Sequence, residues 1–202
     1  MTEGLKALLR AVAAVAVLPA LLSLALRARL FGRDRAFQAS TEWLALVPGL
    51  SGQYLRRAFL AAATRGCGPE AVIGTGTVFS SADVRIGRNA YIGPHCDIGW
   101  ADIEEDVMIA AGTHVPSGAD THGTARVDLP MRDQAGTPRC VRIAEGAWIG
   151  NQAVVLADVG RHAIVGAGAV VTRPVPDYAV ALGVPAKVVR DRRTAPAAAD
   201  QS

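Results

Sequence analysis

A histidine on an interrupting segment is the strongest chemical signal in this sequence of 202 residues. His122 lies in the stretch "SGADTHG", two residues after Asp120, where a regular pattern of aliphatic residues stops. Histidine side chains ordinarily titrate at about pH 6.5, so a neutral imidazole can accept a proton near neutral pH. We therefore expect His122 to be a general base, with Asp120 as a neighbour that could orient it. An exposed loop histidine without a role is the alternative.

The other three histidines allow further interpretations. His95, His114 and His122 could supply zinc ligands, because imidazole nitrogen is a common ligand of zinc. His114 directly precedes an aliphatic position, so it could neighbour His122 across successive coils or be a structural residue. His162, in "VGRHAI", has no partner visible in the sequence and is expected in a solvent-facing turn.

A repeat of six residues predicts the elements that must position these histidines. Each unit of six suits a flat strand and a tight turn, and three units make one triangular coil whose aliphatic side chains point inward. A β-sandwich would instead alternate with a period of two and turn every 8–12 residues. The aliphatic positions are Ile86, Ile92, Ile98, Ile103, Ile109 and Val115, then Ile143, Ile149, Val155, Val159, Val165 and Val171.

Two features depart from this period. Between Val115 and Ile143 lie 27 residues that fit no coil, and we expect them to form an active-site loop, 116–142, since repeat proteins carry insertions on a functional face. The step from Val155 to Val159 is only four residues and predicts one shortened corner late in the repeat.

Residues 73–190 resemble the hexapeptide-repeat acyltransferases. The repeat, the loop "SGADTHG", the later "WIG" and the terminal "GVPAKVVR" occur in the order found in bacterial sugar and polysaccharide O-acetyltransferases, such as the maltose, galactoside and colanic-acid enzymes. The resemblance implies a left-handed parallel β-helix, a homotrimer with active sites between subunits, and acetyl transfer from acetyl-CoA to a saccharide hydroxyl. It places His122 at the catalytic histidine. An asparagine often lies near the position of His95, which implies an acceptor contact there; a plain surface corner is the alternative.

The resemblance also implies an acetyl-CoA groove in the second half of the repeat, with no metal. Converging Lys and Arg side chains suit the phosphates of CoA. Arg192 and Arg193 are expected in a solvated tail. The implied cofactor-binding residues are Asn151 and Ala167 along the pantetheine arm, Thr172 and Arg173 toward the nucleotide, and Lys187 and Arg190 near the phosphates.

The N-terminal third is apolar and basic. Residues 1–66 carry nine Lys or Arg against three Asp or Glu, whereas the remainder carries twelve against fifteen. Residues 11–26, "AVAAVAVLPALLSLAL", hold no charge, and a membrane-spanning helix needs about 20 apolar residues. We expect residues 5–35 to contact the anionic inner membrane surface. A cleaved signal peptide, or a helix packed on the protein or on a neighbouring subunit, are the alternatives.

Two further helices, "FQASTEWLALV" and "SGQYLRRAFLAAAT", are predicted on either side of Pro48-Gly49, the second capped by Ser51. The predicted organisation is therefore a helical segment at 1–66, a mainly β domain at 67–190 and a disordered tail at 191–202. Cys67, Cys96 and Cys140 are an odd number without a CxxC motif, which favours reduced thiols in a cytoplasmic setting.

Four functions compete on this evidence. Basic patches with interleaved aromatic residues are absent from the sequence, which argues against nucleic-acid binding. The favoured function is an acetyl-CoA-dependent O-acetyltransferase acting on a sugar or a lipid-linked polysaccharide precursor, at the cytoplasmic side of the membrane or in the cytoplasm. The alternatives are an N-acetyltransferase on an amino sugar, a γ-type carbonic anhydrase-like zinc protein and a non-catalytic trimeric scaffold.

Overall fold

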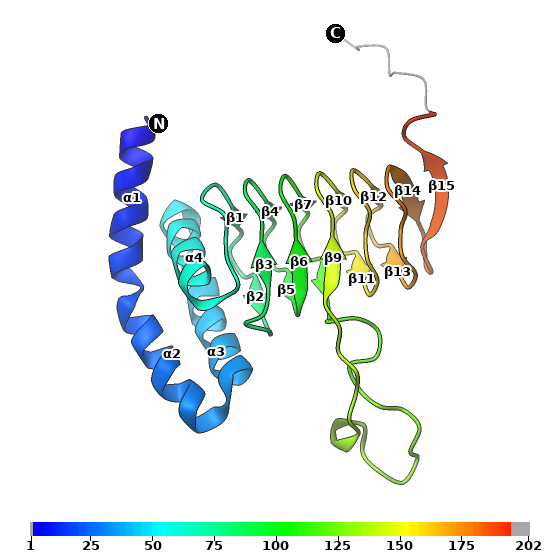
Figure 1. The fold of residues 1–202 in the computed structure, drawn as a ribbon, viewed down its shortest axis with the longest axis horizontal. Coiled ribbons are helices and arrows are strands. Elements are labelled where there is room, and N and C mark those ends of the chain that lie inside the picture. Colours follow the sequence, from blue (N-terminus) through cyan, green and yellow to red (C-terminus); the bar gives the residue numbers. More distant parts are fainter. Residues whose placement is uncertain (1, 195–202) are drawn as a thin grey trace.

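Four helices precede the β domain in the computed structural model, which describes residues 2–194. They are α1 (Glu3–Ala16), α2 (Leu18–Phe31), α3 (Arg33–Ala45) and α4 (Gly49–Ala63). In Figure 1, α1 and α2 follow one another as one long helical segment, and the chain then turns back into α3. Gly32, with φ +86°, makes this turn in a conformation that favours glycine. Pro48 precedes the first turn of α4, so the prediction that Ser51 caps this helix is wrong.

The β domain is a parallel β-helix with three faces. The first face holds β1, β4, β7, β10, β12 and β14, with β15 added at its end; the second holds β2, β5, β8, β11 and β13; the third holds β3, β6 and β9. Strands of successive coils pair in parallel, and β15 alone pairs antiparallel among the described strands. The predicted β-helix is thus confirmed and the β-sandwich is wrong. The bounds are β1 (Val72–Ile73), β2 (Val78–Phe79), β3 (Arg85–Ile86), β4 (Tyr91–Ile92), β5 (Asp97–Ile98), β6 (Ala101–Ile103), β7 (Met108–Ile109), β8 (His114–Val115), β9 (Val141–Ile143), β10 (Trp148–Ile149), β11 (Val154–Val155), β12 (Ile164–Val165), β13 (Val170–Val171), β14 (Ala179–Leu182) and β15 (Lys187–Asp191).

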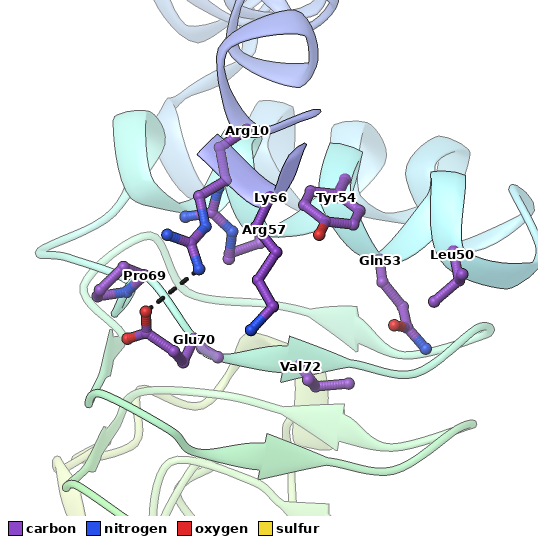
Figure 2. Close-up of a pocket in the computed structure, with 10 residues that line it drawn as sticks. Lys6, Arg10, Leu50, Gln53, Tyr54, Arg57, Pro69, Glu70 and Val72 are labelled. Carbon is purple, nitrogen blue, oxygen red and sulfur yellow. Dashed lines mark hydrogen bonds and ion pairs between the residues drawn. The ribbon is translucent and has the colours of Figure 1, made fainter. Parts of the chain in front are cut away.

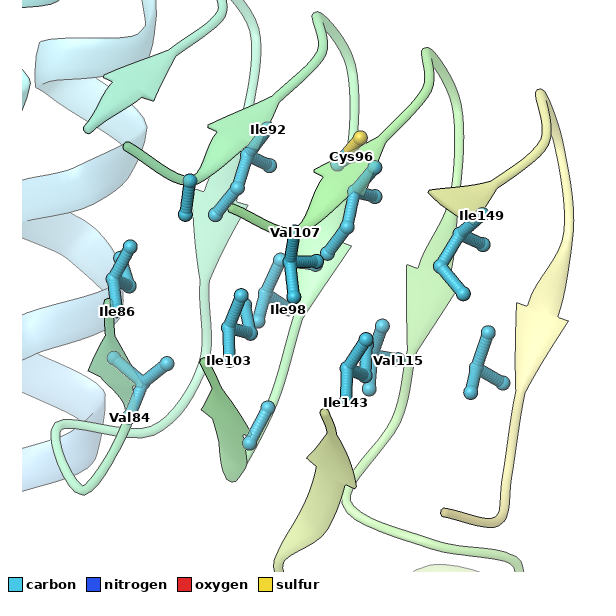
Figure 3. Close-up of a cluster of buried hydrophobic side chains, with 14 of the residues drawn as sticks. Val84, Ile86, Ile92, Cys96, Ile98, Ile103, Val107, Val115, Ile143 and Ile149 are labelled. Carbon is cyan, nitrogen blue, oxygen red and sulfur yellow. The ribbon is translucent and has the colours of Figure 1, made fainter. Parts of the chain in front are cut away.

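The core of the β domain is a stack of aliphatic side chains. All twelve residues that the period of six predicts to point inward are at most 2% exposed. Figure 3 shows those between Ile86 and Ile149 meeting inside the coils, with each layer resting on the next. In register they form columns, such as Ile92 on Ile109 on Ile149. Removing this apolar surface from water is the main stabilising contribution to the domain.

The short step at Val155–Val159 is not confined to one coil. The step from the inward residue of the second face to the inward residue of the third face is five residues at Ile98–Ile103 and four residues at Val171–Val175. Val159 pairs in parallel with both Ile143 and Val175. The prediction of a single shortened corner is therefore corrected: the passage from the second to the third face is four residues long in the next coil as well, at Val171–Val175.

Helices α3 and α4 close the N-terminal end of the β-helix. An open first coil would leave strand groups unpaired, and the helices supply partners for several of them. The Thr41 hydroxyl accepts a hydrogen bond from Phe79 N at 3.1 Å, and Gly76 N donates to Ala45 O at 2.9 Å. The buried Arg56 guanidinium donates to Ile73 O at 3.1 Å and to carbonyls at the end of α3. The helices and the first coil thus form one packed unit.

Helices α1 and α2 lie against α3 and α4 and present a second face to solvent (Figure 1). Ala13 and Val17 on the inner face are buried in the common core. The stretch Glu3–Phe31 spans 29 residues, and an 18-residue window within it has a mean hydropathy of 2.2, so it is long and apolar enough to cross a membrane. The outer face is made of exposed apolar side chains, including Leu5, Leu8, Val12, Val15, Leu22 and Leu26.

At the C-terminal end, β15 extends one residue beyond the predicted boundary of the β domain, to Asp191. Most of the predicted disordered tail, residues 195–202, lies outside the described residues.

Candidate functional site

The interrupting segment leaves the β-helix between β8 and β9 as a two-limbed arm, residues 116–140 (Figure 1). Its limbs run antiparallel. Arg139 N donates to Ser117 O at 2.8 Å, Thr137 N donates to Asp120 O at 2.7 Å, and His122 forms an antiparallel bridge with Ala135. The segment is therefore an ordered ribbon that carries His122 away from the coil.

The root of the arm is fixed by side chains that sequence reasoning missed. The Arg139 guanidinium donates to Asp158 at 3.3 Å and to Leu156 O at 3.1 Å, both on the next coil. The Ser117 hydroxyl accepts a hydrogen bond from Trp100 N at 2.8 Å. No periodic signal marks these residues, because their partners lie on other coils. Together they set the direction in which the arm leaves the β-helix.

His122 lies exposed on the first limb of the arm. Its backbone is held by the bridge to Ala135, and its ring makes no hydrogen bond or ion pair with any residue between 2 and 194. Asp120 is also exposed and accepts a bond through its backbone carbonyl, without a carboxylate contact to His122 in the same range. The imidazole is accessible to solvent, and its orientation by Asp120 stays a prediction.

The tip of the arm is organised around Gln134. Its side-chain amide donates to Arg126 O at 2.7 Å and to Leu129 O at 3.1 Å, and its amide oxygen accepts from Arg126 N at 3.0 Å. The tip also presents apolar side chains to solvent, with Val127 101% and Met131 58% exposed. An ordered tip with exposed apolar residues is suited to contact another surface.

Four of the predicted cofactor-binding residues flank the second face of the β-helix. Asn151 and Ala167 are exposed at its corner with the first face, where Asn151 O accepts from Gly168 N at 2.8 Å. Thr172 and Arg173 are exposed directly after β13, at the opposite edge. The arm leaves from this same edge after β8, two strands away along the sheet. At about 4.8 Å per strand, the separation along the stack is about 10 Å.

Lys187 and Arg190 lie at opposite ends of β15. Lys187 pairs with Leu182 and Arg190 pairs with Val180 in the antiparallel ladder. Both are exposed, and neither forms an ion pair with another described residue. The structure does not bring the two cations to one point within this chain.

Arg192 and Arg193, expected in a solvated tail, have partners on the protein. Arg192 donates to the His162 carbonyl, and Arg193 pairs with Asp191 at 2.6 Å. The hydrogen bond from Arg193 lowers the pKa of Asp191 to about 2. Arg193 also lies 5.0 Å from the centre of the Tyr178 ring. These contacts hold Arg192 and Arg193 against the last coil.

His95 and His162 occupy corners of the coil in the same manner. Both have positive φ, 56° and 52°, and each ring covers a glycine of an adjacent coil. A Cβ on Gly76 would lie 2.2 Å from Nδ1 of His95, and Gly146 stands in the same relation to His162. His95 is at the corner of the first and second faces, whereas the arm leaves from the other edge of the second face.

His114 points outward on the second face in register with Asp97, between the two edges. The three histidines considered as zinc ligands are thus spread over a corner, a face and the arm. Among residues 2–194, no group of three His, Cys, Asp or Glu side chains could hold a metal ion.

No protein-family model matches the chain. It is nevertheless similar to curated acetyltransferases. It is 35% identical over 112 residues to a probable acetyltransferase of Mycobacterium tuberculosis, covering 54% of this chain and 36% of that protein. It is 32% identical over 137 residues to the serine acetyltransferase of Haemophilus influenzae, covering 66% and 42%. It is 50% identical over 48 residues to a dTDP-3-amino-3,6-dideoxy-α-D-galactopyranose 3-N-acetyltransferase of Aneurinibacillus thermoaerophilus, covering 23% and 25%. The chain spans less than half the length of each.

Solved structures share the fold. A maltose O-acetyltransferase from Clostridium difficile 630 superposes with a TM-score of 0.70 at 19% identity, covering 80% of this chain and 88% of that one. A galactoside acetyltransferase in complex with coenzyme A superposes with a TM-score of 0.61 at 21% identity, covering 79% and 80%. In fold, and in sequence over its repeat, this chain resembles the hexapeptide-repeat acetyltransferases.

Proposed function

We propose that this protein is an acetyl-CoA-dependent O-acetyltransferase that acts on a hydroxyl of a sugar or of a lipid-linked polysaccharide precursor. One observation supports this function most strongly. The exposed His122 is carried by an ordered arm rooted at the edge of the face that the predicted cofactor-binding residues flank. The relatives and fold neighbours named as acetyltransferases supply the reaction class.

In the proposed reaction each part of the site has one role. The imidazole of His122 accepts the proton of the acceptor hydroxyl as its oxygen attacks the thioester carbonyl. The C–S bond then breaks, and the imidazolium returns the proton to the CoA thiolate. Asn151 and Ala167 line the pantetheine arm, Thr172 and Arg173 the nucleotide end, and Lys187 and Arg190 the phosphates. Asp120 and His95 contribute on the acceptor side.

The proposal includes assembly as a homotrimer. On the outer side of the first face, Tyr91, Met108 and Trp148 stand in register and are 42%, 49% and 46% exposed. Large apolar side chains stacked in this way favour a contact that removes them from water. When a neighbouring subunit packs on this face, Lys187 and Arg190 of one subunit can contact the same CoA as Lys187 and Arg190 of the next.

The proposal also places the protein at the cytoplasmic side of the membrane. The exposed apolar residues of α1 and α2, with the exposed cations Arg29 and Arg35 near one end, support binding to an anionic surface. Cell fractionation of the full chain tests this localisation. Recovery of all of the protein in the soluble fraction would exclude it.

The experiment that tests the catalytic proposal is release of CoA thiol from acetyl-CoA across a panel of acceptors. The panel holds sugars, lipid-linked sugars, amino sugars and L-serine, because serine and amino-sugar acetyltransferases are among the relatives. His122→Ala is expected to lower kcat by about 10²–10⁴-fold. His162→Ala, at a corner away from the second face, is the matched control.

Undiminished turnover by His122→Ala would exclude His122 as the base. Product formation only on amino sugars would assign the reaction to N-acetylation. Calorimetric titration with CoA separates an enzyme from a scaffold, because a non-catalytic prism has no reason to bind CoA.

A further inference from the structure

A pocket of about 280 Å³ lies between α1, α4 and the first coil, far along the molecule from the arm. Figure 2 shows its lining, with Lys6 and Arg10 from α1, Tyr54 and Arg57 from α4, and Glu70 from the first coil. This volume is many times the minimum of about 10–15 Å³ that accommodates one water. It is large enough for a phosphate group and a short alcohol attached to it.

The pocket has an excess of positive charge. Three cations line it against one carboxylate, Glu70, which Arg10 contacts at 3.2 Å. Lys6 binds Glu3 at 2.6 Å, on the exposed surface of α1. Arg57 forms no hydrogen bond or ion pair within the described part of the chain and stands beside Arg10 in Figure 2. A guanidinium without a partner, aimed into a space shared with two other cations, is suited to an anion.

The location of the pocket favours a phosphate over a carboxylate. An Arg fork binds two phosphate oxygens at once, and the adjacent ammonium and phenol hydroxyl can reach the remaining oxygens. The pocket is on the inner side of α1, whereas Leu5, Leu8 and Val12 cover the outer side of the same turns. A phosphate in this position lies at the boundary between an apolar layer and water, where lipid headgroups lie.

We propose that the pocket lined by Lys6, Arg10 and Arg57 binds a phosphate ester, separately from the acetyl-transfer site. Two sources share this chemistry, the headgroup of an anionic phospholipid and a soluble phosphate ester. The pocket is remote from the arm, so the ligand is not the group that is acetylated in the same subunit. The inference does not depend on the proposed catalytic activity.

The test uses the full chain and two probes. Calorimetric titration with sn-glycerol 3-phosphate measures the soluble ester, and sedimentation with phosphatidylcholine vesicles, with and without phosphatidylglycerol, measures the headgroup. Arg57→Gln is expected to weaken binding of the phosphate ester about tenfold or more, because a charge-assisted contact is lost. Arg161→Gln is the matched control, since it removes the same charge from an exposed corner of the β-helix outside the pocket.

Saturable binding of glycerol phosphate that Arg57→Gln weakens at least about tenfold and Arg161→Gln leaves unchanged supports the proposal. An added preference for phosphatidylglycerol vesicles that follows the same pattern assigns the pocket to a headgroup; without that preference, the ligand is a soluble ester. No saturable binding of either probe, or equal losses in both variants, overturns it. Lys6→Gln provides a second variant, and far-UV circular dichroism checks that all the proteins are folded.

Discussion

At the scale of single residues, the site depends on how well the arm holds His122. Arg139 ties the arm to Asp158 and Leu156 on the following coil. Arg139→Met should lower the free energy of unfolding by less than about 1 kcal/mol, because exposed ion pairs contribute little. It should nevertheless lower kcat about tenfold, because the base is no longer held in position. Steady-state kinetics and denaturant unfolding measure the two effects.

The control for this prediction is Arg126→Met, which removes the ion pair with Asp128 in the same arm without touching its root. Equal turnover by the two variants would mean that the root does not position the base.

The reactivity of the three cysteine thiols is also predicted at this scale. Burial raises the pKa of Cys67 to about 12, and burial raises the pKa of Cys96 and of Cys140 as well. Because the thiolate is the reactive form, an aromatic disulfide reagent should react slowly with the native protein at pH 8. Absorbance should report three rapidly reacting thiols only after unfolding in guanidinium chloride. Fast reaction of a native thiol would contradict this expectation.

At the scale of elements, the period of six predicts twelve inward positions correctly, because the coil repeats the same geometry and each aliphatic residue meets its equivalent in the next coil. The arm could not be predicted in the same way. Its ribbon is defined by contacts such as Arg139 to Asp158, which join unrelated positions in the sequence. The start of α4 was misplaced because Ser51 is a common capping residue, whereas Gly49 begins this helix.

The joint between the helices and the β-helix makes a prediction about stability. Arg56 is 2% exposed and donates to the carbonyls of Ile73, Leu44 and Val47. Arg56→Met leaves these carbonyls without the guanidinium, and we expect the free energy of unfolding to fall by about 3 kcal/mol. Arg29→Met, on the exposed side of α2, should change it by less than about 0.5 kcal/mol. Chemical denaturation measures both, and a loss below 1 kcal/mol for Arg56→Met would contradict the assigned role.

At the scale of the whole molecule, the first face of the β-helix should join the subunits. Trp148 points outward there between Met108 and Ile164. The next residue, Ile149, points inward and is fully buried in the core. Trp148→Arg should convert a trimer to a monomer without unfolding it, because a charge buried against an apolar partner is costly. Light scattering after size-exclusion chromatography measures the mass. Gln38→Arg adds the same charge on exposed α3 as a control, and a wild-type monomer would exclude the assembly.

The arm has a further consequence for how such a protein diversifies. Its limbs leave and return at adjacent points, Ser117 and Arg139, so β8 and β9 continue the coil as though nothing lay between them. Replacing the segment between Ser117 and Arg139 can therefore change the length and chemistry of the ribbon without changing the register of the β-helix strands. Under the proposed function, selectivity toward acceptors can therefore change with the ribbon while the β-helix stays the same.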